Sequence, residues 1–345
     1  MSFLGNALIA KIKNMYSQSL KPEDYQDLLR KRTIYDVAMF LKKHPAYKDI
    51  LANVPEGSLN RGRLEGLIKR QRFNNMIKIL KFVTLKDESF YRLSFVQMEH
   101  ETILTIIRAI ISHEDYDVVE LIPYYFDKYS TLDFLAMTKA TDIASLVAAL
   151  DGTRYAKMLK PYANVKNEDI HYYEFEALFE ADYYKYAFEN IKRNYKGKLR
   201  TDLDDAFKTR IEIENMIKVY RLKKFYGVKS NDIKSILIPI PTSRISEKKL
   251  DEIIAIKNPD DIFKKIVELG IGPYLTNKDQ VYLEYFGDYM RFVLARKFIY
   301  FATDAAKVFQ GYAFYSELET QNLTHIIEGI RYQISESEIR TMLVF

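Results

Sequence analysis

The sequence predicts an all-α fold, and three observations support that prediction. Turn-forming residues are scarce, with 12 Gly and 9 Pro among 345 residues. So few of them cannot easily supply the many tight turns of a β-sandwich or barrel. Apolar residues recur at the i, i+3, i+4, i+7 spacing of a helix that has one buried face. One helical pattern also occurs three times at similar spacing, which indicates a triplicated helical unit.

Helical segments can be placed along the chain from their apolar spacing and start signals. Pro22, ahead of Glu23 and Asp24, is typical of a first helical turn. The segment Asn258-Pro259-Asp260-Asp261 is a second capped start. Four further segments carry an apolar helical face: Phe73–Leu80, Ile103–Ile110, Met216–Tyr220 and Leu323–Ile330.

One segment cannot be helical. Ile236–Ser243 contains Pro239 and Pro241 within eight residues. Proline lacks the backbone N–H and disfavours helical geometry in the residue before it. We therefore predict an extended connector here.

Length and composition define the class of protein. The chain exceeds the roughly 250–300 residues at which a single core stops growing, so two or three domains are expected. It is 48% apolar and 29% charged, which excludes intrinsic disorder. The absence of cysteine excludes disulfides, thiolate metal sites and thiol nucleophiles, and favours a reducing compartment. The longest uncharged stretch, residues 1–10, is half the roughly 20 residues of a spanning helix and does not resemble a signal peptide.

Three boxes of residues repeat in the same order. Segments 99–108, 212–221 and 319–328 align without gaps, and their leading glutamates are 113 and 107 residues apart. An Asp-aromatic box recurs at 182–186 and 288–292. An opening box, followed by a tyrosine, occurs as Asp36-Val37 with Tyr47, Asp142-Ile143 with Tyr155, and Asp261-Ile262 with Tyr274. Ordered boxes at matching spacing predict three similar helical domains, at residues 1–114, 115–230 and 231–345.

Catalytic motifs are missing. No phosphate-binding loop occurs, and Gly270-Ile271-Gly272 lacks the third glycine of a dinucleotide site. His113-Glu114-Asp115 could in principle bind a cation, but a solvated loop is the favoured interpretation. Glu212 and Glu214 would point about 200° apart on a helix, so they cannot act on one substrate. We expect no catalytic residue, no cofactor, no metal and no enzymatic activity of the chain's own.

Arg61–Lys86 is strongly basic, with eight basic residues against Glu65, while residues 87–120 are strongly acidic. A basic helix can bind nucleic acid, anionic lipid or an acidic partner. The overall charge is only +5, and the 27 Tyr and 21 Phe fall mainly at core spacing instead of between the basic residues. A solvated helix facing the acidic neighbour is therefore favoured over nucleic-acid binding.

The repeated helix also has a second, polar face. Glu101 and Arg108 share a stripe opposite the buried isoleucines, and the later repeats place residues on the same stripe. Three such helices around a threefold axis would suit a ring or a shaft as partner, and plain solvent exposure is the alternative. The candidate partner-binding residues are Glu99, Glu101, Arg108, Glu212, Glu214, Arg221, Glu319, Gln321 and Glu328.

The same segments resemble a known family. The opening Ala10–Met15 and Tyr25–Leu29, the boxes Glu212–Arg221 and Glu319–Glu328, and the closing residues through Arg340 are similar to the C subunits of archaeal and bacterial A/V-type rotary ATPases. These C subunits are equivalent to the d subunits of the eukaryotic vacuolar enzymes. Glu328 departs from the arginines at positions 108 and 221, so an identical role for the third repeat is not implied.

The resemblance implies a fold and a function. It implies a pseudo-threefold funnel of three helical domains, without an active site, present as one copy in the complex. The funnel would sit peripherally on the cytoplasmic face of a membrane, between the proteolipid rotor ring and the central-stalk subunits D and F. It would couple ATP hydrolysis or synthesis to proton or sodium transport. A triplicated scaffold or adaptor, and a nucleic-acid binder using Arg61–Lys86, are the alternatives.

Overall fold

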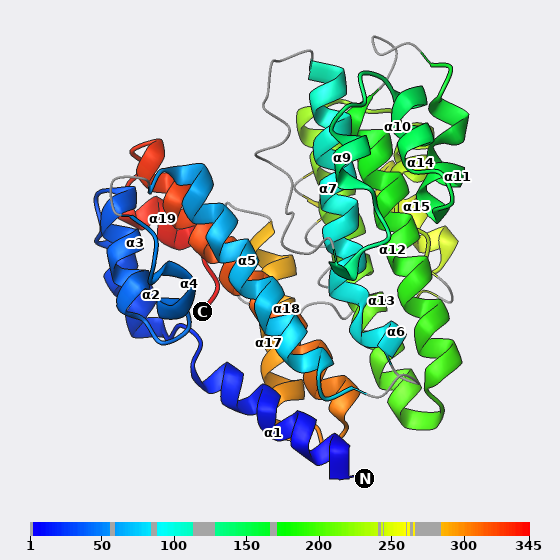
Figure 1. Ribbon diagram of the computed structural model, residues 1–345. Coiled ribbons are helices and arrows are strands. Elements are labelled where there is room, and N and C mark those ends of the chain that lie inside the picture. The colour runs from blue at the N-terminus through cyan, green and yellow to red at the C-terminus, as the bar shows by residue number, and fades with distance from the viewer. Residues whose placement is uncertain are drawn as a thin grey trace. The chain divides into compact units, whose positions relative to one another are not determined.

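A computed structural model describes residues 3–55, 59–83, 88–112, 128–165, 171–240, 243, 245–259, 261–262, 265 and 284–345. Every regular element in these ranges is helical, which confirms the all-α prediction. The chain divides into two compact units, Met1–Tyr91 with Asn194–Phe345, and Arg92–Arg193. Figure 1 shows the helices in chain order. The division into three domains stays a prediction.

The first unit contains helices from both ends of the chain. They are α1 (Phe3–Ser17), α2 (Pro22–Leu29), α3 (Ile34–Lys43), α4 (Lys48–Leu51), α5 (Arg61–Leu80), α6 (Glu88–Tyr91), α13 (Gly197–Phe225), α14 (Ser230–Ile236), α15 (Glu247–Ala255), α17 (Glu284–Phe301), α18 (Ala305–Arg331) and α19 (Glu336–Met342). The second unit contains α7 (Leu93–Ser112), α9 (Phe134–Met137), α10 (Ile143–Ala149), α11 (Arg154–Leu159), the 3₁₀ turn η3 (Lys160–Tyr162) and α12 (Tyr172–Asn194), whose last residue enters the first unit.

The predicted helix starts are confirmed where they are described. Pro22 is the first residue of α2. Two opening boxes lie in capped first turns. Asp142 is the N-cap residue of α10 and accepts the N–H of Ser145 over 2.7 Å, whereas Asp36 is the third residue of α3 and its N–H donates to Oγ1 of the cap Thr33 over 3.1 Å. Each cap satisfies an N–H that has no partner within its own helix. The sequence boxes thus mark real helix N-termini.

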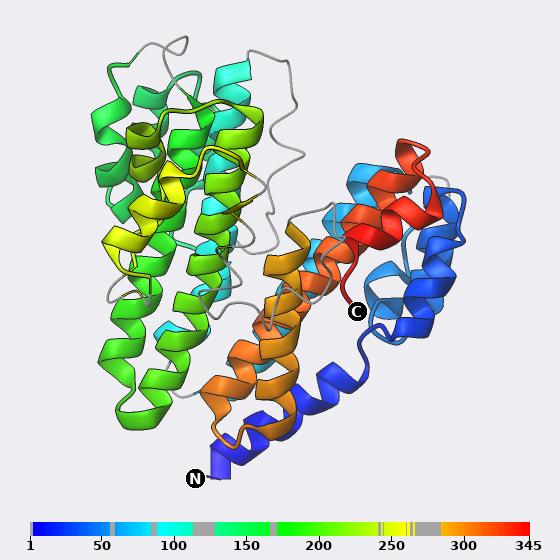
Figure 2. The same ribbon diagram turned by 180° about the vertical axis from the view of Figure 1, so that it is seen from behind.

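The centre of the first unit is the antiparallel hairpin of α17 and α18. Figures 1 and 2 show α1 and α5 lying along α18. Gly311 allows the hairpin to close, because a Cβ at this position would lie 2.9 Å from the backbone oxygen of Ala295 and 2.9 Å from the Cβ of Phe298. The two helix backbones therefore approach more closely than any residue with a side chain would allow.

The N-terminal helices form one core with the C-terminal ones. Tyr25, Leu28 and Leu41 are buried against Leu323 and Ile326 of α18. The same core includes Ile339 of α19 and Ile68 of α5. Helices from opposite ends of the chain thus complete a single bundle.

The predicted connector is confirmed over residues 237–240, but the prediction was wrong at Ile236, which is the last helical residue of α14. Helix α14 ends at Ile236, and Leu237 is extended, with φ −73° and ψ 145°. Pro241 and Thr242 lie outside the described residues, as do Gly270–Pro273, Tyr274 and His113–Asp115.

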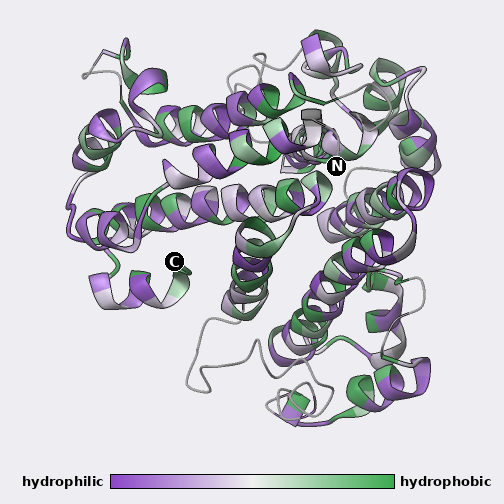
Figure 3. Ribbon diagram, turned by 90° about the horizontal axis from the view of Figure 1, so that it is seen from below, coloured by the Kyte–Doolittle hydropathy of each residue, from purple (hydrophilic) through white to green (hydrophobic). Residues whose placement is uncertain are grey.

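Hydrophobic and hydrophilic residues are interspersed along the helices, as Figure 3 shows. In the ranges described above, no helix combines the length and apolarity needed to cross a bilayer.

Candidate functional site

The box that begins with glutamate occurs three times, and each copy lies on a long helix. Residues 99–108 lie on α7, residues 212–221 on α13 and residues 319–328 on α18. The isoleucines of the α7 box are buried, at positions 103, 106, 107 and 110. On the polar stripe, Glu101, Arg108 and Arg221 are exposed, while Glu214, Gln321 and Glu328 are half-buried. The predicted two-faced helix is therefore present, and its polar face is most open on α7.

The leading glutamates of the boxes all accept hydrogen bonds inside the protein. Glu99 accepts from Oγ of Ser130 over 2.6 Å and from the hydroxyl of Tyr155 over 2.6 Å. Tyr155 is almost completely buried. Glu99 thus fastens α7 to the short helices that follow it in the second unit.

Glu212 repeats part of this arrangement. It is 1% exposed and accepts from Oγ of Ser243 over 3.2 Å. Ser243, like Ser130, stands 31 residues after its glutamate. Each serine also accepts an N–H from the second residue after it, Leu132 at 3.1 Å and Ile245 at 3.0 Å. The glutamate–serine contact and the backbone bond to the serine are therefore shared by the two repeats.

Glu319 repeats the tyrosine contact. It accepts the backbone N–H of Leu20 over 2.9 Å and the hydroxyl of Tyr47 over 2.8 Å. Tyr47 and Tyr155 each follow an opening box at a similar distance, Tyr47 11 residues after Asp36 and Tyr155 13 residues after Asp142. Burial raises the pKa of Glu319 to about 7, although the bonds from Tyr47 and Leu20 act to lower it.

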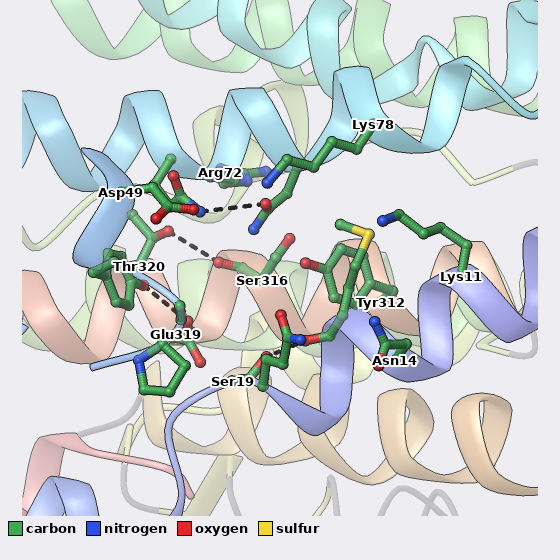
Figure 4. A pocket seen from close by; sticks show the side chains of 17 residues that line it. Lys11, Asn14, Ser19, Asp49, Arg72, Lys78, Tyr312, Ser316, Glu319 and Thr320 are labelled. Atoms are coloured by element: carbon green, nitrogen blue, oxygen red, sulfur yellow. Dashed lines mark hydrogen bonds between the residues drawn. The ribbon is translucent and has the colours of Figure 1, made fainter. Parts of the chain in front are cut away.

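Glu319 lies at the edge of a polar cavity of about 160 Å³, which Figure 4 shows. Helices α1, α5 and α18 contribute to its lining. The polar side chains around it include Lys11, Asn14, Asp49, Arg72, Lys78 and Ser316.

Two asparagines fasten the extended segments that follow the box helices. The amide of Asn215 donates to the C=O of Ile238 over 2.8 Å and accepts its N–H over 2.9 Å. Asn322 does the same with Val344, at 2.8 and 3.2 Å. Both asparagines stand three residues after the leading glutamate of their box. The sequence contained this signal, an Asn shared by two boxes, but only the structure shows its backbone partner.

These contacts cross the predicted domain boundaries. Glu99 binds Tyr155, and Glu212 binds Ser243, each from the following repeat. Glu319, in the last repeat, binds Tyr47 in the first. Each box helix is thus completed by short helices or connectors of the next repeat, and the last box helix is completed by the first repeat.

A buried charged cluster joins α13, α17 and α18. Arg210 lies 3.1 Å from Glu317, and Arg291 lies 2.7 Å from the same carboxylate. Arg291 also pairs with Asp288, and Arg210 with Glu214 at 2.8 Å. Burial alone would raise the pKa of Glu317, but Arg210 and Arg291 hold it well below its ordinary value. The carboxylate therefore remains charged.

Two stripe residues are also held in this region of the molecule. Gln321 accepts from Arg291 over 2.9 Å. Glu328 pairs with Arg61 at the start of α5, and Arg61 also reaches Glu65 over 3.0 Å. The basic run of α5 is thus partly used within the fold.

The second unit contains a related cluster. Asp182 lies 3.1 Å from Nε2 of His100 and 3.1 Å from Arg154. Asp182 and Asp288 occupy the same position in the Asp-aromatic box. Each pairs with a basic side chain, His100 for Asp182 and Arg291 for Asp288. Burial lowers the pKa of His100 despite the neighbouring Asp182. Arg108 donates to the hydroxyl of Tyr172 over 2.8 Å, and its guanidinium lies 4.6 Å from that ring.

The described residues contain no group of three or more His, Cys, Asp or Glu side chains arranged to hold a metal ion. Glu212 and Glu214 indeed point to different partners, Ser243 and Arg210. The geometry is that of a helical assembly with an exposed polar stripe.

Comparison with known proteins identifies the family. A search of curated proteins gives no match. A family model described as "ATP synthase (C/AC39) subunit" matches residues 8–342, nearly the whole chain. That family supplies an accessory component of the V-type ATPase complex. The chain belongs to the ATP synthase (C/AC39) subunit family, the C subunits of the V-type ATPases.

Proposed function

We propose that this chain is the non-catalytic rotor component that links the central stalk, subunits D and F, to the proteolipid ring. It would lie on the cytoplasmic face of the membrane and carry torque between ATP hydrolysis or synthesis and proton or sodium transport. The match to the C/AC39 family over residues 8–342 is the observation that carries this proposal. The three predicted helical domains would surround the foot of the stalk.

The exposed members of the stripe are the best candidates for stalk contacts. Glu101, Arg108 and Arg221 are exposed, whereas Glu99, Glu212 and Glu319 are occupied inside the fold. Glu214, Gln321 and Glu328 bond to arginines, so they would present only part of their surface. A coupling component must transmit strain through packed elements, and the buried ion pairs and interlocked repeats support that role.

Binding measurements test the proposal. We expect the purified chain to bind a D–F complex and, separately, the detergent-solubilised ring, each with at least micromolar affinity. Glu101→Lys should weaken stalk binding by about tenfold or more, because a reversed charge opposes a complementary surface. Glu189→Lys, an exposed glutamate on α12, is the matched control. Absence of binding to both stalk and ring would overturn the proposal.

A further inference from the structure

The C-terminal end of α17 exposes aromatic side chains that the fold leaves uncovered. Phe301 is 82% exposed, the highest value among the large apolar residues described, and Tyr300 is 54% exposed. Their backbone is held in place: Nζ of Lys13 lies 3.5 Å from the carbonyl of Tyr300, and the ring of Tyr16 packs edge-on to Tyr300 at 5.7 Å. Tyr300 and Phe301 are the last two residues of α17, and Figures 1 and 2 show this end of the α17–α18 hairpin beside α1.

A cavity of about 430 Å³ opens beside these rings. Its apolar lining comes from Leu294, Phe298, Phe301 and Ala302, with Ala206 from α13. Charged and polar residues complete the lining, so the hollow combines apolar and polar walls next to the exposed Phe301; they are Lys198, Asp202, Asp205, Thr209, Lys297 and Lys307.

Ammonium groups surround this apolar hollow. Lys198 and Lys297 line it and are exposed, and Lys196 stands at the start of α13. In the described part of the chain none of these three has a carboxylate partner. Lys307 is neutralised by Asp202 at 2.8 Å, which leaves Asp205 as the remaining acid of the lining. The free charges at this edge are mainly positive.

We infer that this edge, Lys196, Lys198, Lys297, Tyr300 and Phe301, is a docking surface for an anionic phospholipid bilayer. Aromatic and apolar side chains beside lysines are the composition of interfacial membrane contacts, in which the rings enter the headgroup boundary. Lysines close to the surface add attraction to anionic lipids. A hollow lined by both apolar residues and lysines suits an acyl chain next to a phosphate, whereas free phosphate would gain nothing from the apolar residues.

The other end of α13 offers a matched control. Phe225 and Tyr226 are 66% and 69% exposed, so they are as open as the proposed surface. The lysines beside them are occupied: Lys223 donates to the carbonyls of Ile254 and Ile256, and Lys224 contacts Tyr220. Lys229 is exposed nearby, so among the described residues this end of α13 offers exposed rings with one unpaired lysine where the proposed surface has three.

Vesicle co-flotation tests the inference with the full chain. We expect binding to vesicles of phosphatidylcholine with phosphatidylglycerol and little binding to pure phosphatidylcholine. Phe301→Ser should weaken binding on the order of tenfold, and Lys196→Glu with Lys198→Glu by at least roughly 25-fold, since each change removes an attraction and adds a repulsion. Phe225→Ser with Tyr226→Ser should leave binding unchanged. Added salt should weaken binding of the wild-type chain.

The contrary outcomes are distinct. Equal binding to neutral and anionic vesicles, no binding, or an equal loss in the Phe225/Tyr226 control would overturn the inference. Phe301→Ser could instead lose binding to the proteolipid ring while its vesicle binding stays unchanged. That result would assign the surface to a protein contact and would also overturn the inference. The vesicles contain neither stalk nor ring, so lipid docking can fail while the proposed coupling function stands, and the reverse.

Discussion

Glu317 and Glu319 lie two residues apart on α18, and both are buried, yet their surroundings differ in kind. Glu317 faces two arginines and stays ionised, with a pKa below its ordinary range. Glu319 faces a tyrosine hydroxyl and a backbone N–H, and its pKa is raised to about 7. Equal burial thus gives opposite protonation behaviour, because formal cations offset the desolvation of a carboxylate and single hydrogen bonds do so only partly.

Of the changes considered, removal of the Glu317 carboxylate should have the largest effect on stability. Glu317→Ala should destabilise the first unit by about 3–5 kcal/mol, because Arg210 and Arg291 would keep buried charges without their shared partner. Urea denaturation at neutral pH measures this. Arg200→Ala, which removes the more exposed pair with Asp204, should cost below about 1 kcal/mol. Equal losses in the two variants would show that the buried cluster has no special role.

The pH dependence of stability tests Glu319. Its pKa is raised in the folded state, so the unfolded chain loses this proton first as the pH rises. The stabilising contribution is complete below about pH 4.5 and falls by about 3 kcal/mol as the pH rises to about 7. Glu319→Gln should lack this fall, because the amide can accept from Leu20 and donate to Tyr47 without ionising.

Urea denaturation of wild type and variant across that range gives the difference curve. Glu252→Gln, an exposed glutamate on α15, should reproduce the wild-type profile. Parallel curves for wild type and Glu319→Gln would contradict the raised pKa. Glu317 behaves oppositely: its depressed pKa makes it a source of acid sensitivity below about pH 4.5.

The asparagine contacts allow the same backbone bonds to be tested in two repeats. Asn322→Ala should cost about 1–3 kcal/mol, because the backbone groups of Val344 would remain buried without partners. Asn215→Ala should cost a similar amount and speed hydrogen exchange at Ile238. Asn14→Ala, at an exposed position, should change stability by less than about 0.5 kcal/mol. Unaltered exchange at Ile238 in Asn215→Ala would contradict the assigned contact.

The tyrosine contacts should give the smallest effect. Tyr47→Phe and Tyr155→Phe each remove one hydroxyl donor to a glutamate, at a cost of about 0.5–1.5 kcal/mol. Tyr47→Phe should also raise the pKa of Glu319 further, since the Tyr47 hydrogen bond lowers it. Thermal denaturation measures the stability change, with Tyr226→Phe as an exposed control. A loss in the control as large as in Tyr47→Phe would contradict the assignment.

Much of this arrangement could be predicted from sequence because it is local. Scarce glycine and proline, apolar spacing and cap residues such as Pro22 act within one helical turn, and they place the helices correctly. The repeated Glu of each box was found, but its interior role was not. Spacing along one helix gives the direction of Glu212 relative to Glu214, and it cannot name Ser243 as the partner.

The charged cluster was missed for a similar reason. Arg210, Arg291 and Glu317 stand on three helices, and only their tertiary packing brings them together. Arg291 stands in the Asp-aromatic box, but Arg210 and Glu317 lie outside every repeated box. Burial of charge is decided by the whole fold, so no local pattern announces it.

The hydrogen bond between Leu20 and Glu319 joins residues 299 apart in sequence, so it can form only after nearly the whole chain has been synthesised. Helices α2, α3 and α4 leave the ribosome early, but the α18 residues that cover Tyr25 and Leu41 emerge near the end of translation. The second unit, by contrast, is continuous in sequence and can close as soon as Arg193 has emerged. The apolar faces of the N-terminal helices therefore stay uncovered by α18 while most of the chain is synthesised. Formation of the core of the first unit is thus a late step, and its long sequence separation makes it a slow one.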